Sequence, residues 1–74
     1  MNTSIRILLA DDHPSLRDGL ASILDSQPDL SVVAQAGTGR EAVEKFKITN
    51  PDLLIVDLRM PGGDGIQTIK ELVA

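Results

Sequence analysis

Apolar residues gather in three short runs, at residues 5–10, 31–36 and 52–57, and the segments between them repeat apolar positions with helical spacing. Short runs rich in branched aliphatic side chains predict buried strands. In the third run, four apolar residues, Leu53-Leu54-Ile55-Val56, lead directly into Asp57. Pro61 follows four positions later and stops any continuation of this strand. We therefore expect the third strand to deliver one carboxylate to an edge of a sheet.

The segment between the first two strands predicts a helix that begins at Pro14. Proline suits the first helical position, where its missing N–H needs no partner and its φ fits the first turn. Apolar residues then recur at i, i+4, i+7 and i+8, which predicts one stripe facing the sheet; they are Leu16, Leu20, Ile23 and Leu24. Gln27-Pro28-Asp29 ends the helix.

Two further helices are expected from residue pairs with capping-box spacing. Thr38 and Glu41 can each accept from a free backbone N–H at a helix start. The inner face of that helix is expected to hold Ala42, Val43 and Phe46, and Asn50-Pro51 ends it. After a turn at residues 62–65, Asp64 and Gln67 repeat the spacing. The residues expected to face inward in this third helix are Ile66, Ile69, Leu72 and Val73.

Three strands that alternate with three helices predict an α/β fold with a parallel sheet and right-handed crossovers. Ligands of such sheets bind at the carboxyl ends of the strands. Asp11 and Asp12 follow the first strand and Asp57 ends the third. These three carboxylates meet at one edge if the first and third strands are neighbours.

Composition and charge exclude several classes of function. The chain of 74 residues has room for one domain, residues 1–74. Seven basic against eleven acidic residues give a net charge of −4, and no basic stripe is present, which argues against direct contact with nucleic acid. The absence of cysteine excludes disulfides and thiolate metal sites. The N-terminal apolar run is too short for a signal or membrane segment, so we expect a cytoplasmic protein without membrane contact.

Three converging carboxylates need a cation or raised pKa values, because two unit charges about 5 Å apart repel by roughly 3 kcal/mol at an effective dielectric constant near 20. Oxygen ligands without His or Cys favour Mg²⁺ or Mn²⁺. Such a metal would hold a phosphoryl group for attack by Asp57, which predicts a covalent acyl phosphate. Each aspartate taken singly also fits a turn or cap at a strand end. The three together favour the functional interpretation.

Three ordered motifs resemble the receiver domain of bacterial two-component response regulators. They are Ile-Leu-Leu-Ala-Asp-Asp-His-Pro at residues 7–14, Asp-Leu-Leu-Ile-Val-Asp-Leu-Arg-Met-Pro at residues 52–61, and Asp64-Gly65. The Asp-Asp-His-Pro motif is most similar to the subfamily with a LuxR-type helix-turn-helix output domain. The resemblance covers essentially the whole chain. It implies a flavodoxin-like, three-layer fold with strand order 2-1-3 for these three strands.

The resemblance also implies roles for individual residues. Asp57 would be the phosphoacceptor, taking a phosphoryl group from a phosphohistidine of a sensor histidine kinase, and would contribute to the metal site. Asp12 would bind Mg²⁺ directly, Asp11 through water, and Arg59 through its backbone carbonyl. In the family, phosphorylation biases a surface in the second half of the domain. The chain would then be an acceptor and not an enzyme, and it would control DNA only through an output domain that lies outside these residues.

The sequence departs from the family pattern in two places. A receiver has five strands, of which the fourth delivers a Ser or Thr and the fifth a Lys that hold the phosphoryl oxygens, and neither strand is found in these 74 residues. Lys70 lies in the third predicted helix and does not replace that lysine. Gly63 stands where a bulky apolar residue is common in the family. We therefore expect the N-terminal part of a receiver domain, in which the third strand is an edge that invites self-association or partner binding.

Four functions are compatible with parts of this pattern. The first is a phosphorylatable signalling module, and the second is a phosphotransfer-incompetent receiver fragment that acts structurally or as a decoy through protein contacts. A phosphatase of the haloacid dehalogenase type would need a second Asp two positions after Asp57, where Arg59 stands. A nucleotide-binding Rossmann half would need a glycine-rich turn after the first strand, where Asp-Asp-His-Pro stands. The sequence therefore favours the first two.

Three other features have two interpretations each. His13 either tunes the metal site or acts in acid–base chemistry, or it is a polar residue at a helix start. Arg59 either limits the access of water to an acyl phosphate or is a solvated loop residue. Thr38-Gly39-Arg40 forms either a phosphate nest or a helix cap, and capping is favoured because no glycine-rich pattern surrounds it.

Overall fold

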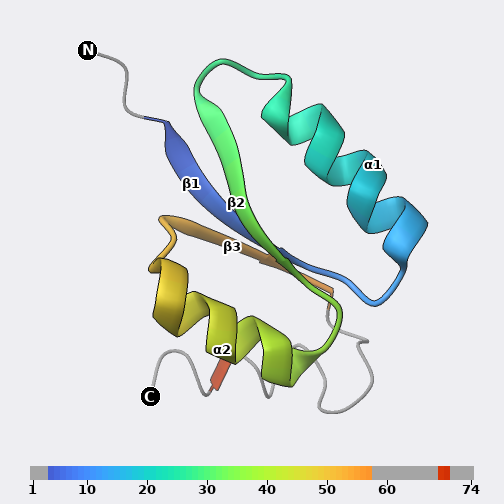
Figure 1. Ribbon diagram of the computed structural model, residues 1–74, viewed down its shortest axis with the longest axis vertical. Helices are drawn as coiled ribbons and strands as arrows, with labels where there is room; N and C mark the ends of the chain where they lie inside the picture. The colour runs from blue at the N-terminus through green and yellow to red at the C-terminus, as the bar shows by residue number, and fades with distance from the viewer. Residues whose placement is uncertain (1–3, 58–68, 71–74) are drawn as a thin grey trace.

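A computed structural model of the chain describes residues 4–57 and 69–70. Within them, three strands alternate with two helices, in the order β1 (Ile5–Ala10), α1 (Pro14–Asp25), β2 (Leu30–Ala36), α2 (Gly39–Thr49) and β3 (Leu53–Val56) (Figure 1). The strands form one parallel sheet in the order β2-β1-β3. The predicted α/β fold and strand order are therefore confirmed.

Strand β1 lies at the centre of this sheet. Ile7, Leu8 and Leu9 are fully buried, because β1 has a hydrogen-bonded strand on each side and helices cover the sheet. Figure 1 shows α1 and α2 on opposite sides of the strands. The chain moves outward from β1 to β2 and then returns past β1 to β3. The connections therefore diverge between β1 and β3, and ligands of open parallel sheets bind at the carboxyl ends of the strands at such a point.

Helix α1 meets the sheet on a face that differs from the predicted stripe. Leu20 and Leu24 are partly buried as expected, but Leu16 and Ile23 are 55% and 63% exposed. Ala21 is buried instead, and Arg17 is partly buried beside it. With about 100° per residue, the buried face is rotated by roughly 65° from the centre of the apolar stripe. The prediction that Leu16 and Ile23 face the sheet was wrong, because periodicity shows where apolar residues cluster and not which part of the cluster the sheet covers.

Helix α2 follows the sequence prediction closely. The Thr38 side chain accepts a hydrogen bond from Glu41 N, 3.1 Å long. The Glu41 carboxylate accepts in return from Gly37 N, at 2.7 Å, one residue earlier than an ordinary capping box. Ala42 is fully buried and packs with Ala10 and Ala36, with Val56 against them. These small side chains let α2 lie close to the sheet.

The helix ends at an asparagine, which begins the turn into β3. Asn50 has φ 48° and ψ 60°, the left-handed conformation that asparagine tolerates at a helix end, and its N–H bonds to Phe46 O. Asp52 then pairs with Arg6 through both backbone and side chain, because Arg6 N donates to Asp52 Oδ2 and Arg6 O accepts from Asp52 N. These contacts fix where β3 starts along β1.

Predictions about the C-terminal part of the chain can be compared with the structure only at two residues. Ile69 and Lys70 are helical, as expected for the third helix. Ile69 is 37% exposed, so the expectation that it faces inward is wrong for the described structure. The turn at residues 62–65 and the other residues of that helix lie outside the described residues. No helix in the described part of the chain is long and apolar enough to cross a membrane.

Candidate functional site

The acidic residues that follow β1 and β3 are placed by hydrogen bonds that continue the sheet beyond its strands. Asp11 N donates to Ala36 O on β2, and Asp57 N donates to Ala10 O on β1, both at 2.9 Å. Because Ala10 pairs with Val56 in the parallel register, the residues that come next lie side by side. The sequence reaches this arrangement by ending two apolar runs with aspartate at matching points. The three predicted acids therefore meet at the carboxyl edge of the sheet.

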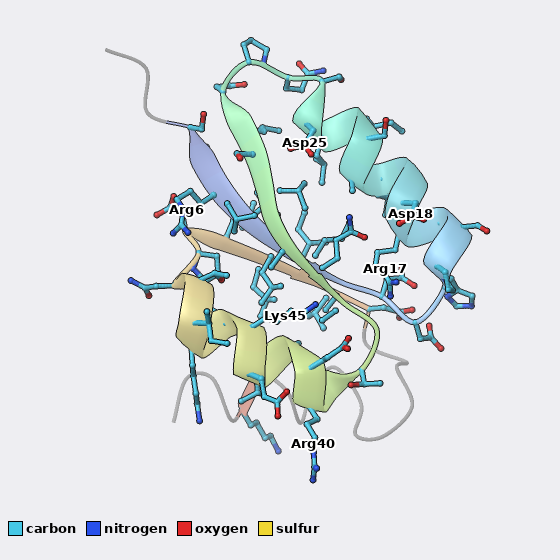
Figure 2. All side chains as sticks on the ribbon, viewed as in Figure 1. Arg6, Arg17, Asp18, Asp25, Arg40 and Lys45 are labelled. Atoms are coloured by element: carbon cyan, nitrogen blue, oxygen red, sulfur yellow. The ribbon has the colours of Figure 1, made fainter. Side chains whose placement is uncertain are left out.

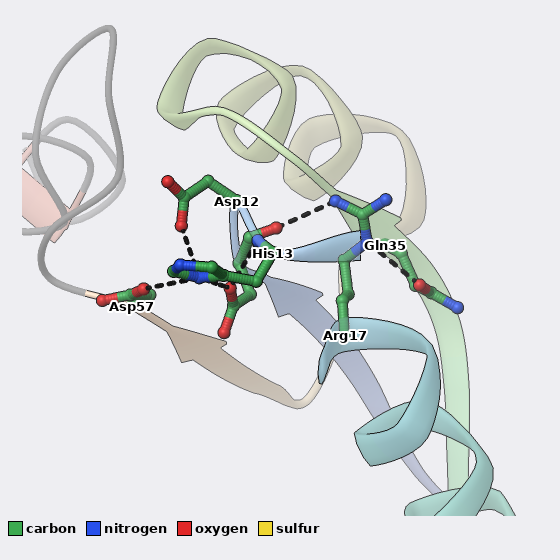
Figure 3. Close-up of polar contacts among 6 residues, drawn as sticks. Asp12, His13, Arg17, Gln35 and Asp57 are labelled. Carbon is green, nitrogen blue, oxygen red and sulfur yellow. Dashed lines mark hydrogen bonds and ion pairs between the residues drawn. The ribbon is translucent and has the colours of Figure 1, made fainter. Parts of the chain in front are cut away.

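Four side chains form the resulting cluster, because His13 joins the acids. One ligand atom from each of Asp11, Asp12, His13 and Asp57 can be chosen so that all lie within 4.8 Å of one another. His13 Nδ1 lies 3.0 Å from Asp11 Oδ1, 2.9 Å from Asp12 Oδ1 and 4.0 Å from Asp57 Oδ2. Figure 3 shows the imidazole between Asp12 and Asp57. Nδ1 thus lies within 4.0 Å of a carboxylate oxygen of each of the three acids.

Asp11 is the most buried of the three acids and forms a tight local turn. Its side chain is 10% exposed, and Oδ1 accepts from His13 N at 2.8 Å. This backbone hydrogen bond stabilises the carboxylate and lowers the pKa of Asp11, with further lowering from the His13 side chain and Arg17 and an opposing effect of burial. Asp11 is therefore held as an anion in the wall of the site.

His13 acts differently from a polar helix cap. It occupies the N-cap position of α1, but its side chain makes no capping hydrogen bond. Its ring is 64% exposed and turns toward the acids. The hydrogen bond in which Asp11 accepts from the imidazole raises the pKa of His13, and the nearby charges of Asp12, Asp11 and Asp57 raise it further. Of the two interpretations of this residue, the structure favours the one that places it in the acidic site. The signal in the sequence was its position directly after Asp11-Asp12.

One carboxylate oxygen in the cluster lacks a hydrogen bond. Asp12 Oδ1 is shielded from solvent and has no hydrogen-bond partner among the described residues, although His13 Nδ1 lies 2.9 Å away. A single ring nitrogen carries at most one proton, and the contact with Asp11 Oδ1 has hydrogen-bond geometry. A buried oxygen without a donor is unfavourable by about 1–3 kcal/mol. A cation would satisfy this oxygen together with its neighbours.

The charges of the cluster also suit a divalent cation. Three carboxylates carry more negative charge than one imidazole can balance, and all four groups lie within a few ångströms of one another. The carboxylate oxygens of this set suit Mg²⁺ and Mn²⁺, and an imidazole nitrogen suits Zn²⁺. The chemistry of the residues that are present therefore fits a bound divalent ion. Arg59, predicted to contribute a backbone carbonyl, lies outside the described residues.

Arg17 supports the loop that carries Asp11, Asp12 and His13, and sequence patterns did not indicate this. Its Nη1 donates to Asp11 O at 2.8 Å and its Nε to Gln35 Oε1 on β2 at 3.2 Å. Figure 3 shows the guanidinium reaching from α1 to both partners. A Cβ at Gly37 would lie 2.9 Å from Arg17 Nη1, so the glycine leaves space for this side chain. The only signal in the sequence was that Arg17, a cationic residue, lies four positions after His13 on a helix that was expected to pack against an apolar sheet.

The start of α2 provides a cap and not a phosphate site. Glu41 N donates to the Thr38 hydroxyl, and the Glu41 carboxylate already accepts from Gly37 N. An anion there would meet this negative side chain. The capping interpretation of Thr38-Gly39-Arg40 is therefore favoured by the structure.

Comparison with known proteins places this architecture in one family. A family model described as the response regulator receiver domain matches residues 7–74. The nitrate/nitrite response regulator protein NarL of Escherichia coli K12 is 42% identical over 66 residues, which cover 89% of this chain and 31% of that protein. The chain thus spans about a third of the length of this curated relative.

Solved structures agree with the sequence comparison. The signal receiver domain of a response regulator named NarL from Mycobacterium tuberculosis has a TM-score of 0.91 and 35% identity, over 96% of this chain and 57% of that one. RcsB of Salmonella enterica serovar Typhimurium, solved bound to promoter rprA with the phosphomimetic BeF₃⁻, has a TM-score of 0.85 and 30% identity, over 95% of this chain and 36% of that one. The flavodoxin-like arrangement, the acidic edge and the family match agree, and the chain belongs to the response regulator receiver domain family.

Proposed function

We propose that the chain is a phosphoacceptor module of a two-component phosphorelay, in which Asp57 takes a phosphoryl group from a sensor histidine kinase. The observation that carries this proposal is the convergence of Asp11, Asp12 and Asp57 at the carboxyl edge of the sheet, between β1 and β3. Membership of the receiver family supports it, since receivers of response regulators are phosphoacceptors. The protein would be the acceptor in this transfer and not an enzyme.

The residues suggest how the transfer proceeds. An Asp57 carboxylate oxygen attacks the phosphorus atom, the bond from phosphorus to the donor histidine nitrogen breaks, and an acyl phosphate forms on Asp57. Asp57 is suited to this because its backbone is fixed by the hydrogen bond to Ala10 O, and its side chain is 19% exposed, enough to meet a donor. The Asp11 and Asp12 carboxylates would repel the incoming phosphoryl group if they remained uncompensated.

Mg²⁺ is the cation that we propose for compensation, with Mn²⁺ as a substitute. Asp11, Asp12 and Asp57 would hold it, with the Arg59 backbone carbonyl as the family resemblance implies. When bound, it neutralises the acids and orients the phosphoryl oxygens. The buried Asp12 Oδ1 without a hydrogen bond supports a cation at this position.

Control of transcription would require further residues. RcsB was solved on promoter DNA, and NarL is a response regulator, which supports an output domain that binds DNA in proteins of this kind. The present chain has a net charge of −4 and would contribute the phosphorylation step, in the cytoplasm where sensor kinases present their phosphohistidine.

Mass spectrometry of the intact chain tests the proposal. After incubation with Mg²⁺ and acetyl phosphate, we expect one added phosphoryl group on the wild type and none on Asp57→Asn. Asp18→Asn is the matched control, because Asp18 is an exposed acid on α1 whose loss leaves the cluster intact. An adduct that persists in Asp57→Asn would disprove the assignment of the acceptor. A folded wild type that takes no phosphoryl group would favour the second candidate, a decoy receiver fragment that acts through protein contacts.

A protein partner at the β3 edge is part of the proposal in either case. Strand β3 is the last strand on its side of the sheet among the described residues, and Leu53 is 45% exposed. An edge strand that no further strand covers favours pairing with another chain. We expect self-association, measured by light scattering, to increase from low to high micromolar concentration. A monomer throughout that range would contradict this expectation.

A further inference from the structure

The position of His13 Nδ1 adds a nitrogen atom to the carboxylate oxygens of the acidic cluster. Its contacts with Asp11 Oδ1 and Asp12 Oδ1 are 3.0 and 2.9 Å, and its distance to Asp57 Oδ2 is 4.0 Å. Ligands bound at about 2.1 Å in octahedral geometry lie roughly 3.0 Å apart when adjacent and about 4.2 Å apart when opposite. The distances from Nδ1 to the three oxygens are therefore close to those between ligands of one ion.

A single hydrogen bond from Nδ1 does not serve all of these oxygens. The one Nδ1 proton can serve Asp11 Oδ1, which leaves Asp12 Oδ1 shielded and without a hydrogen-bond partner in the described residues. A metal ion accepts electron pairs from all of these atoms at once, so it would satisfy the oxygen that the proton cannot. The ring can present its Nδ1 lone pair when Nε2 carries the proton, and the 64% exposure of the side chain lets water accept from that N–H.

We propose that His13 Nδ1 is a nitrogen ligand of the divalent metal site formed with Asp11, Asp12 and Asp57, and that it shifts the site's preference from Mg²⁺ toward Zn²⁺-like transition metals. The inference rests on the proposed function, because it concerns the same site. Imidazole binds zinc and neighbouring transition metals well, whereas Mg²⁺ prefers oxygen ligands and keeps several waters. The receiver would then respond to which cation occupies it, with the Nδ1 proton released to solvent when the metal binds.

The histidine content of the chain makes the ligand directly observable. His13 is the single histidine, and cysteine is absent, so an untagged chain has one ring that can report nitrogen ligation. We would record long-range ¹H–¹⁵N spectra of the ring during titration with Zn²⁺ and, separately, with Mg²⁺. We expect Zn²⁺ to change the Nδ1 resonance more than the Nε2 resonance. A Zn²⁺ effect confined to Nε2, or none at either nitrogen, would overturn the proposal.

Binding affinities provide the second readout. Calorimetry of Zn²⁺ and Mg²⁺ binding is compared for wild type, His13→Ala and His13→Gln, with Asp18→Asn as the control. Gln keeps a side-chain N–H for Asp11 but lacks the imidazole nitrogen, so it separates hydrogen bonding from ligation. We expect both His13 variants to lose about tenfold or more in Zn²⁺ affinity and to change by less than about threefold for Mg²⁺.

The outcomes separate this inference from the proposed function. A wild type that binds Mg²⁺ and is phosphorylated, while the His13 variants bind Zn²⁺ as tightly as wild type, would overturn the ligand role and leave phosphotransfer standing. A uniform gain for both metals in His13→Ala would show that the imidazole competes with cations, which also overturns it. A wild type that binds neither ion would reject the metal site on which both ideas depend, whereas failure of phosphorylation alone would leave the ligand role intact.

Discussion

Replacement of Arg17 tests the structural support beneath the acidic site. Arg17 joins α1 to the loop after β1 through Asp11 O and to β2 through Gln35 Oε1. Truncation to alanine removes both hydrogen bonds. The Asp11 carbonyl then loses its donor from Arg17, although Asp11 is only 7% exposed. Figure 2 shows Arg17 beside the strands, whereas Arg40 points away from the sheet. Arg40→Ala therefore removes the same charge without this support.

The magnitude follows from the two bonds. A hydrogen bond from a charged donor contributes about 1.5–3 kcal/mol, and the longer bond to Gln35 about 0.5–1 kcal/mol. Partial exposure of Arg17 reduces both, so we expect the free energy of unfolding to fall by about 2 kcal/mol. A domain of this size is stable by roughly 4–11 kcal/mol in total. The loss is therefore a large share of the stability.

Urea denaturation followed by circular dichroism measures the effect. With a slope near 1 kcal/mol per molar, the midpoint of Arg17→Ala should fall by about 2 M, and that of Arg40→Ala by less than about 0.5 M. Arg17→Lys should recover about half of the loss, because an ammonium cannot reach both acceptors as the planar guanidinium does. A double-mutant cycle with Gln35→Ala should give a coupling of about 0.5–1 kcal/mol. Equal midpoints for Arg17→Ala and Arg40→Ala would refute the proposed support.

Three further predictions concern the surroundings of the site. Gly37→Ala should lower the free energy of unfolding by about 1 kcal/mol, because its Cβ would lie 2.9 Å from Arg17 Nη1 and would move that nitrogen away from Asp11 O. Gly19→Ala should raise the free energy of unfolding by about 1 kcal/mol, because Gly19 lies in a helix and its Cβ would have nothing within 4 Å. The two variants are compared by urea midpoint, and destabilisation by both would contradict the steric argument. Thr38→Ala should destabilise the chain by about 1 kcal/mol, because the hydrogen bond from Glu41 N is lost, and Thr38→Ser should restore the stability. Thermal unfolding measures both variants. A Ser variant that is as unstable as the Ala variant would count against the cap. For the metal-free chain, the raised pKa of His13, which faces Asp11, Asp12 and Asp57, contributes stability below pH 6.5 that is lost as the pH rises through the higher folded value. The lowered pKa of Asp11 contributes above pH 3.8 and is lost as the pH falls through the lower folded value. Urea midpoints across pH should therefore fall on both sides, and His13→Ala should lose the fall on the alkaline side; an unchanged alkaline limb would exclude His13 as its cause.

The elements that local chemistry specifies were predicted well from the sequence. The strands begin and end within a residue or two of the apolar runs, and the cap at Thr38 forms as expected, although Glu41 bonds to Gly37 N and not to Thr38 N. The face of α1 was predicted less well, because its exposed Leu16 and Ile23 belong to the same apolar stripe as the packed Leu20 and Leu24. The difference depends on which elements cover the helix, and periodicity does not contain that information.

The site divides in the same way. The sequence by itself determined three apolar strands, their parallel pairing through intervening helices, and the placement of Asp11, Asp12 and Asp57 at strand ends. These features depend on residues that are neighbours in the chain, because an apolar run forms a buried strand and the helix after it reverses the chain direction. Only the tertiary structure decided that the His13 ring enters the carboxylate cluster and that Arg17 holds the loop through Asp11 O and Gln35. Those contacts join α1 and the loop after β1 to Gln35 on β2 and to Asp57 after β3. They depend on packing between elements distant in the chain, which no local pattern of residues encodes.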